Sequence, residues 1–120
     1  MTYRISKNFT FSAAHHLPQL PPNHKCHRPH GHNYRVRLEL EGELDERGFV
    51  VDYAELDAFG DWLMRSFDHR DLNDELSYPP TAEHLARECY TRACIELGAA
   101  LVARVGVSET EKTWAWYEPD

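Results

Sequence analysis

The sequence lacks any long apolar segment and has few cysteines. No apolar run among its 120 residues approaches the roughly 20 residues that a helix needs to cross a bilayer. The polar start MTYRISKNFT also lacks the apolar core of a signal peptide. We therefore expect a cytoplasmic protein without membrane contact. Three cysteines are an odd number whose spacing matches no disulfide framework, which favours reduced thiols.

Basic residues are also scarce, because 13 Lys and Arg stand against 20 Asp and Glu, a formal net charge of -7. General nucleic-acid binding needs a positive field, so nucleic acid is not expected as a partner. A small anionic substrate remains compatible with this charge, since a local basic pocket can override it. The length suits a single domain over residues 1–120 with one modest core.

Two segments of the first third alternate between polar and apolar residues, as β-strands do. The first strand is expected over residues 3–12, ending near His15. The second begins at Tyr34, and its apolar side chains at alternate positions predict a half-buried strand antiparallel to the first. Three prolines within residues 18–22 predict a loop between the two strands.

The middle of the chain carries two helical patterns. Asp52 with Glu55 predicts a capped helix start, and apolar residues then recur at helical spacing: Leu56, Phe59, Leu63 and Phe67. Thr81 is the expected N-cap of a second helix, whose apolar stripe is Leu85, Cys89, Ala93 and Leu97, with Gly98 near its end.

The remaining segments complete the predicted fold. Residues 49–51 are interpreted as a short extension of the sheet, residues 68–80 as loop, and residues 102–108 and 113–117 as two further strands. The order strand, strand, helix, helix, strand, strand predicts an α+β fold, a four-stranded antiparallel sheet with two helices on one face.

Histidines concentrate before the second strand. His30 and His32 flank Gly31, so in an extended chain both imidazoles project from one face, and His15 at the end of the first strand could supply a third ligand. Three histidines leave the fourth position of Zn²⁺ open, as in catalytic sites. A histidine at a strand end is more often a hydrogen-bonded surface residue, so spacing alone leaves both interpretations open.

Cys26 lies in the polar loop before this pair. It could be a fourth metal ligand that closes the site, or a reactive thiol beside it. The cationic neighbours Lys25 and Arg28 favour a thiolate that acts as nucleophile or base. Cys89 and Cys94, within the helical repeat, are interpreted as buried and inert.

Seven motifs, in order and spacing over about residues 5–117, resemble the 6-pyruvoyl-tetrahydropterin synthase superfamily: FTFSAAHHLP, HKC, HGHNYRVRLE, GFVVDYAEL, FDHRDLND, PPTAEHLA and VSET. Three residues separate Cys26 from His30. This short spacer resembles the bacterial branch that forms 6-carboxytetrahydropterin for queuosine (7-deazaguanine) synthesis, whereas the pyruvoyl-forming branch has a longer one.

The resemblance implies the tunnelling fold, with homo-oligomers built as trimeric barrels that pair head to head into hexamers. It implies one Zn²⁺ per site, held by three histidines: His15, His30 and His32. The matching cysteine of the family acts as base, which gives that role to Cys26.

The resemblance also assigns the later motifs. Asp68 and His69 match the family's catalytic relay pair, although without the other motifs they would be interpreted as a solvated loop. Glu109 matches the glutamate that anchors the pterin ring, and Thr81, in PPTAEHLA, is grouped with it as substrate-binding. An exposed carboxylate at a strand end would be the ordinary interpretation of Glu109 by itself.

The implied reaction converts 7,8-dihydroneopterin triphosphate into 6-carboxy-5,6,7,8-tetrahydropterin, with loss of acetaldehyde and triphosphate. Two alternatives remain open. One is elimination of triphosphate by a pyruvoyl-forming synthase. The other is a non-catalytic module stabilised by zinc, with Cys26 bound to the metal and folding dependent on it.

Overall fold

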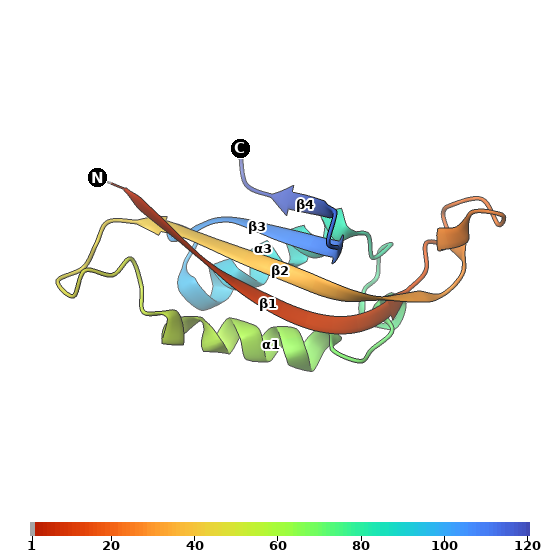
Figure 1. The fold of residues 1–120 in the computed structure, drawn as a ribbon, viewed down its shortest axis with the longest axis horizontal. Helices are drawn as coiled ribbons and strands as arrows, with labels where there is room; N and C mark the ends of the chain where they lie inside the picture. Colours follow the sequence, from red (N-terminus) through yellow and green to blue (C-terminus); the bar gives the residue numbers. More distant parts are fainter. Residues whose placement is uncertain (1) are drawn as a thin grey trace.

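A four-stranded antiparallel sheet forms the backbone of the molecule. The structure is a computed structural model, and it describes residues 2–120. The strands lie in the sheet in the order of the chain (Figure 1): β1 (Tyr3–His15), β2 (His30–Gly42), β3 (Val102–Thr110) and β4 (Thr113–Tyr117). Each neighbouring pair is antiparallel. The predicted α+β fold is thereby confirmed.

The hairpin of β1 and β2 is the longest feature of the sheet. Each strand has 13 residues, against nine in β3 and five in β4. The hairpin therefore extends beyond both ends of β4 (Figure 1), and the molecule measures 56 × 27 × 25 Å. Its register places Tyr3 opposite Gly42 and His15 opposite His30. The loop end of the hairpin, where β1 ends and β2 begins, lies away from both termini (Figure 1).

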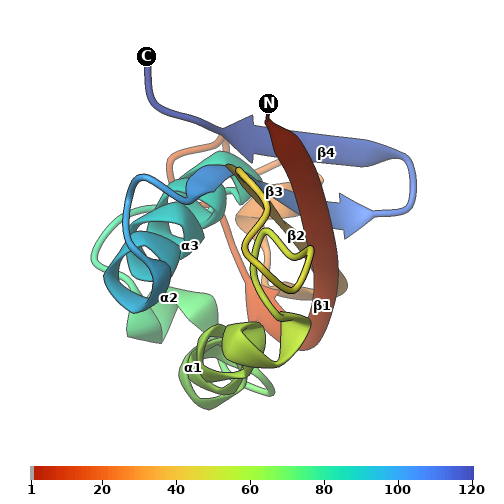
Figure 2. The same cartoon turned by 90° about the vertical axis from the view of Figure 1, so that its left-hand side faces the viewer.

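Helices cover one face of the sheet (Figure 2). The two long ones are α1 (Asp57–Phe67) and α3 (Ala82–Leu97). Their apolar stripes pack on the inward side chains of the strands, and the fully buried members of this core include Phe59, Leu63, Leu85, Val36 and Leu38. Within residues 2–120, no helix has both the length and the apolar character needed to cross a membrane.

The expected helix caps are present. Asp52 accepts a hydrogen bond from the N–H of Ala54, and Glu55 accepts one from the N–H of Asp52. This capping box opens a 3₁₀ turn, η2 (Tyr53–Leu56), and α1 follows directly. The Thr81 hydroxyl accepts a hydrogen bond from the N–H of His84 at the start of α3.

Residues 49–51 do not extend the sheet, so that prediction is wrong. They lie in a loop closed by Asp45, whose backbone N–H donates to the Phe49 carbonyl at 2.8 Å. The Asp45 carboxylate also accepts hydrogen bonds from the N–H groups of Arg47 and Phe49. These bonds turn the chain away from the edge of β2, and three apolar residues in a row do not outweigh them.

Residues 68–80 are not all loop, which corrects a second expectation. They contain α2 (Leu72–Glu75), capped by the Asp71 carboxylate, which accepts the N–H of Asn73. Leu72 is fully buried. A one-turn helix with a single buried residue shows no periodicity, so the pattern of apolar residues could not reveal it.

Candidate active site

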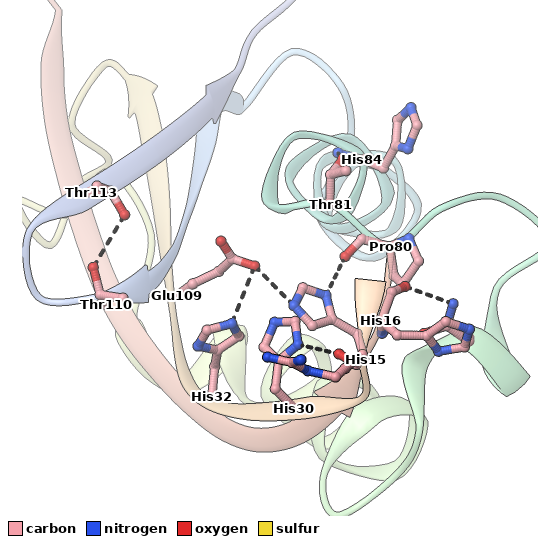
Figure 3. Close-up of polar contacts among 12 residues, drawn as sticks. His15, His16, His30, His32, Pro80, Thr81, His84, Glu109, Thr110 and Thr113 are labelled. Carbon is pink, nitrogen blue, oxygen red and sulfur yellow. Dashed lines mark hydrogen bonds and ion pairs between the residues drawn. The ribbon is translucent and has the colours of Figure 1, made fainter. Parts of the chain in front are cut away.

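Three histidines meet at the loop end of the first hairpin. His15 ends β1 directly opposite His30, the first residue of β2, and His32 is paired with Ala13. Side chains alternate along a strand, so His30 and His32 share the helix-facing side of β2 with the buried Tyr34. The ring centroids are 4.5–5.1 Å apart. Figure 3 shows the three rings converging.

Backbone carbonyls orient two of these rings. Nδ1 of His15 donates to the carbonyl of Pro80 at 2.8 Å, and Nδ1 of His30 donates to the carbonyl of Arg28 at 2.8 Å. A carbonyl only accepts, so Nδ1 carries the proton and Nε2 keeps its lone pair in the neutral ring. This second partner is the usual companion of a metal-bound histidine.

Burial favours the neutral form of two of the three imidazoles. Burial lowers the pKa of His15 and of His32, and the nearby carboxylate of Glu109 only partly opposes that effect. Nε2 of His15 is buried and makes no hydrogen bond, which leaves a lone pair without a partner. One ligand atom from each histidine lies within 4.8 Å of the other two. The neutral, convergent donors fit a metal ion, and these three residues could hold one.

Glu109 reaches the same point from β3. Its Oε2 lies 3.3 Å from Nε2 of His15 and 3.7 Å from Nε2 of His32 (Figure 3). The carboxylate is partly accessible, with 27% of the side chain exposed. Glu109, which the VSET motif singles out, therefore borders the three histidines.

A cavity of about 510 Å³ opens beside the histidines, lined by His15, Leu17, Lys25, Cys26, Arg28, Pro29, His30, His32, Glu109 and Thr110. Cys26 is a free thiol, partly accessible, in the 3₁₀ turn η1 (Lys25–His27). Lys25 and Arg28 form no ion pair within residues 2–120. The cavity thus combines imidazoles, a thiol, two cations without carboxylate partners, and a single carboxylate.

Asp68 and His69 form a second polar corner, after α1. Nδ1 of His69 donates to Oδ2 of Asp68 at 2.7 Å, and the N–H of Ser12 donates to the other carboxylate oxygen at 3.0 Å. Both contacts, the Ser12 N–H first, lower the pKa of Asp68. The His69 side chain is 82% exposed. It lines a different cavity, of about 540 Å³, which shares only His32 with the first.

Thr81 lies at the start of α3, and its hydroxyl caps the helix. It does not line the cavity of the three histidines in a single chain. Its neighbour Pro80 contributes the carbonyl that orients His15. The sequence analysis missed this role, as it missed the carbonyl of Arg28, because a backbone acceptor carries no signature of its own.

The described architecture is the tunnelling fold, a four-stranded antiparallel sheet with helices on one face and a histidine group at the end of its first hairpin. The chain belongs to the 6-pyruvoyl tetrahydropterin synthase family, whose model matches residues 4–120.

Individual relatives agree with this membership. A Synechocystis protein named 6-carboxy-5,6,7,8-tetrahydropterin synthase is 36% identical, and the match covers 94% of this chain and 91% of that protein. A Drosophila melanogaster protein named 6-pyruvoyl tetrahydrobiopterin synthase is 33% identical over 90% of this chain and 74% of its own length. The solved structure of Caenorhabditis elegans 6-pyruvoyl tetrahydropterin synthase superposes with a TM-score of 0.89 at 26% identity, covering 100% of this chain and 97% of that chain.

Proposed function

We propose that the chain is a zinc-dependent lyase that converts 7,8-dihydroneopterin triphosphate into 6-carboxy-5,6,7,8-tetrahydropterin, with release of acetaldehyde and triphosphate. The observation that carries this proposal is the single cavity lined by the three histidines, Cys26 and Glu109. The name of the Synechocystis relative supports the same product. Queuosine (7-deazaguanine) synthesis in the cytoplasm is the proposed context.

The metal is proposed to be Zn²⁺, held by His15, His30 and His32. When bound, Zn²⁺ supplies Lewis acidity that makes protons next to a coordinated substrate oxygen easier to remove. Protein side chains transfer the proton and orient the substrate. Cys26 takes up a proton from the substrate side chain, and Glu109 accepts paired N–H bonds from the pterin ring, which fixes its orientation. Thr81 is proposed to assist substrate binding.

The triphosphate is proposed to bind at the Lys25 and Arg28 side of the cavity. A chain with a net charge of -7 repels a polyanion unless cations face it locally. Both side chains line the cavity and neither is neutralised by a carboxylate within residues 2–120. Arg28 also contacts His30 through its carbonyl, so the cations adjoin the metal ligands.

Asp68 and His69 are proposed to act as a proton relay in the site of a neighbouring subunit. In one chain, Asp68 and His69 line a cavity other than that of Cys26, although the pair and Cys26 are assigned to one reaction. A homo-oligomer, a trimer or a hexamer of two trimers, would bring the two together. The exposure of His69 supports this arrangement, since a partner chain could cover it.

Two other functions are less well supported. A pyruvoyl-forming reaction is suggested by the Drosophila relative, but the three-residue spacer between Cys26 and His30 favours the carboxy product. A closed zinc module needs Cys26 as a ligand. The group of side chains within ligand distance of one another holds the three histidines and not Cys26, so it favours a free thiol.

The test is incubation of the purified protein with 7,8-dihydroneopterin triphosphate, followed by mass analysis of the products. We expect 6-carboxy-5,6,7,8-tetrahydropterin together with acetaldehyde and triphosphate. Accumulation of 6-pyruvoyl-tetrahydropterin would instead establish the second reaction, and unchanged substrate with a zinc-loaded protein would support the structural module.

A further inference from the structure

The carboxylate of Glu109 faces the metal-binding atoms of two histidines. Its Oε2 lies 3.3 Å from Nε2 of His15 and 3.7 Å from Nε2 of His32. Zinc–ligand bonds of about 2.0–2.1 Å at tetrahedral angles place neighbouring ligand atoms about 3.3–3.4 Å apart. The distance from the carboxylate oxygen to His15 Nε2 equals this spacing, and the distance to His32 Nε2 exceeds it by about 0.3 Å.

Charge favours the same contact. Three neutral imidazoles supply no negative charge to a divalent cation. The His15 side chain is only 1% exposed, so a doubly charged ion beside it is poorly solvated. Glu109 is the one carboxylate that lines this cavity. It is the group that can reduce the net charge of the ion.

The Glu109 carboxylate has few polar contacts. Within residues 2–120, no hydrogen bond other than those of its own backbone holds it, and its side chain approaches only the two imidazoles (Figure 3). Glu111, two residues further along, points elsewhere and pairs with Arg35 at 3.3 Å. Within residues 2–120, the two imidazoles are therefore the only polar contacts of this carboxylate.

We infer that Glu109 is the fourth ligand of the metal in the substrate-free protein and leaves it when the pterin ring binds. This inference rests on the proposed metal site and adds a second state of the same carboxylate. The fourth position is then filled in the resting protein and opens only when the pterin N–H groups take up the carboxylate. Metal and pterin compete for Glu109, so each must weaken the binding of the other by the same factor.

The test uses Co²⁺ in place of Zn²⁺, because its visible spectrum reports the number and kind of ligands. Cobalt affinity is measured by competition with a chelator for the wild type, Glu109→Gln and the matched control Glu111→Gln. Losing a charged ligand should weaken cobalt binding at least about tenfold, given that even outer-shell changes cost 10–100-fold. The spectrum of Glu109→Gln should change with it. The control should bind as the wild type does.

A second measurement needs no variant. Pterin itself carries the ring edge but no side-chain oxygen that could bind the metal. Adding it to the cobalt-loaded wild type should alter the spectrum and lower the cobalt affinity. Unchanged affinity and spectrum in Glu109→Gln, or tighter cobalt binding with pterin, would overturn the inference. His30→Ala separates the two proposals: if it abolishes cobalt binding while Glu109→Gln does not affect it, the three-histidine site stands and Glu109 is not a ligand.

Discussion

Two corners of the molecule carry histidines suited to different chemistry. His15 is 1% exposed and donates Nδ1–H to a backbone carbonyl, whereas His69 is 82% exposed and donates Nδ1–H to the carboxylate of Asp68. A neutral carbonyl orients a neutral ring, which suits a metal ligand. A carboxylate partner fixes the orientation of an exposed ring, which suits the proposed proton relay.

The two corners also differ in how complete they are within one chain. The three histidines, Cys26 and Glu109 line one cavity, whereas His69 lines another. The backbone at His69 has a φ of 59°, in the left-handed region, and its N–H donates to the Ser12 carbonyl. A non-glycine residue in that region costs conformational free energy. At His69 this backbone conformation occurs together with an exposed imidazole. Under the proposed function, the first corner serves its own chain and the second serves a neighbouring subunit.

The largest effect is expected at the first corner. His30→Ala removes one of three neutral donors, and the other two cannot retain the ion at comparable affinity. Bound zinc, measured by elemental analysis, should fall well below one per subunit, and turnover should be lost with it. His27→Ala is the control, because Nδ1 of His27 donates to the Leu20 carbonyl, away from the histidine group. A normal zinc content in His30→Ala would remove it from the ligand set.

Cys26→Ala should lose turnover but keep its metal. A base that only transfers a proton contributes roughly 10²–10⁴-fold in rate. The thiol lies outside the group of ligand atoms, so zinc content and melting temperature should match those of the wild type. Pterin binding should also persist, since Glu109 is unchanged. Loss of zinc together with activity would place Cys26 in the coordination sphere.

Mixed oligomers test whether the two corners meet between subunits. Cys26→Ala and His69→Ala subunits should each be inactive, and subunit exchange should create some sites with an intact cysteine from one chain and an intact relay pair from another. Part of the wild-type rate should then return. Mixtures of each variant with itself are the control. No recovery in oligomers shown to be mixed would assign both corners to the same chain.

Local patterns in the sequence predicted most of the fold. Alternation marked both long strands, and the capping pair of Asp52 and Glu55 marked a helical start that is present. These signals are local because backbone periodicity and capping involve residues close in the chain. The short helix α2 and the Asp45-closed loop escaped, because single buried residues and turn hydrogen bonds leave no period.

Only the part of the site that lies on the first two strands could be predicted from the residues themselves. The His30 and His32 pair follows from strand geometry, and His15 from the pairing of the two strands. The contact of His15 with the Pro80 carbonyl spans 65 residues, and no pattern of residue types encodes it. The approach of Glu109 to two imidazoles likewise depends on the order of β1, β2 and β3 in the sheet. Assignment of roles to Asp68 and His69 came from family resemblance and remains a prediction.

The smallest expected effect concerns the two hydrogen bonds that the Asp68 carboxylate accepts at the second corner. Asp68 accepts the N–H of Ser12 and the Nδ1–H of His69, and these contacts lower its pKa. A carboxyl whose pKa is depressed on folding stabilises the protein above its unfolded pKa of about 3.9, and that contribution is lost as the pH falls through the folded pKa. Asp68→Asn keeps an acceptor for Ser12 but loses the charge. Its melting temperature should lie a few degrees below that of the wild type at pH 7.

The pH dependence of the difference between the wild type and Asp68→Asn shows whether the carboxylate stabilises the protein through its charge or through the conformation of the turn. The difference in melting temperature should be constant from pH 7 to about pH 5 and should begin to shrink near pH 4, where the carboxyl of the unfolded chain takes up its proton. It should vanish only when the pH falls through the lowered pKa of the folded carboxyl. Asp61→Asn, on the exposed side of α1, controls for the loss of one negative charge. A difference that persists unchanged to low pH would mean that Asp68 acts through the shape of the turn.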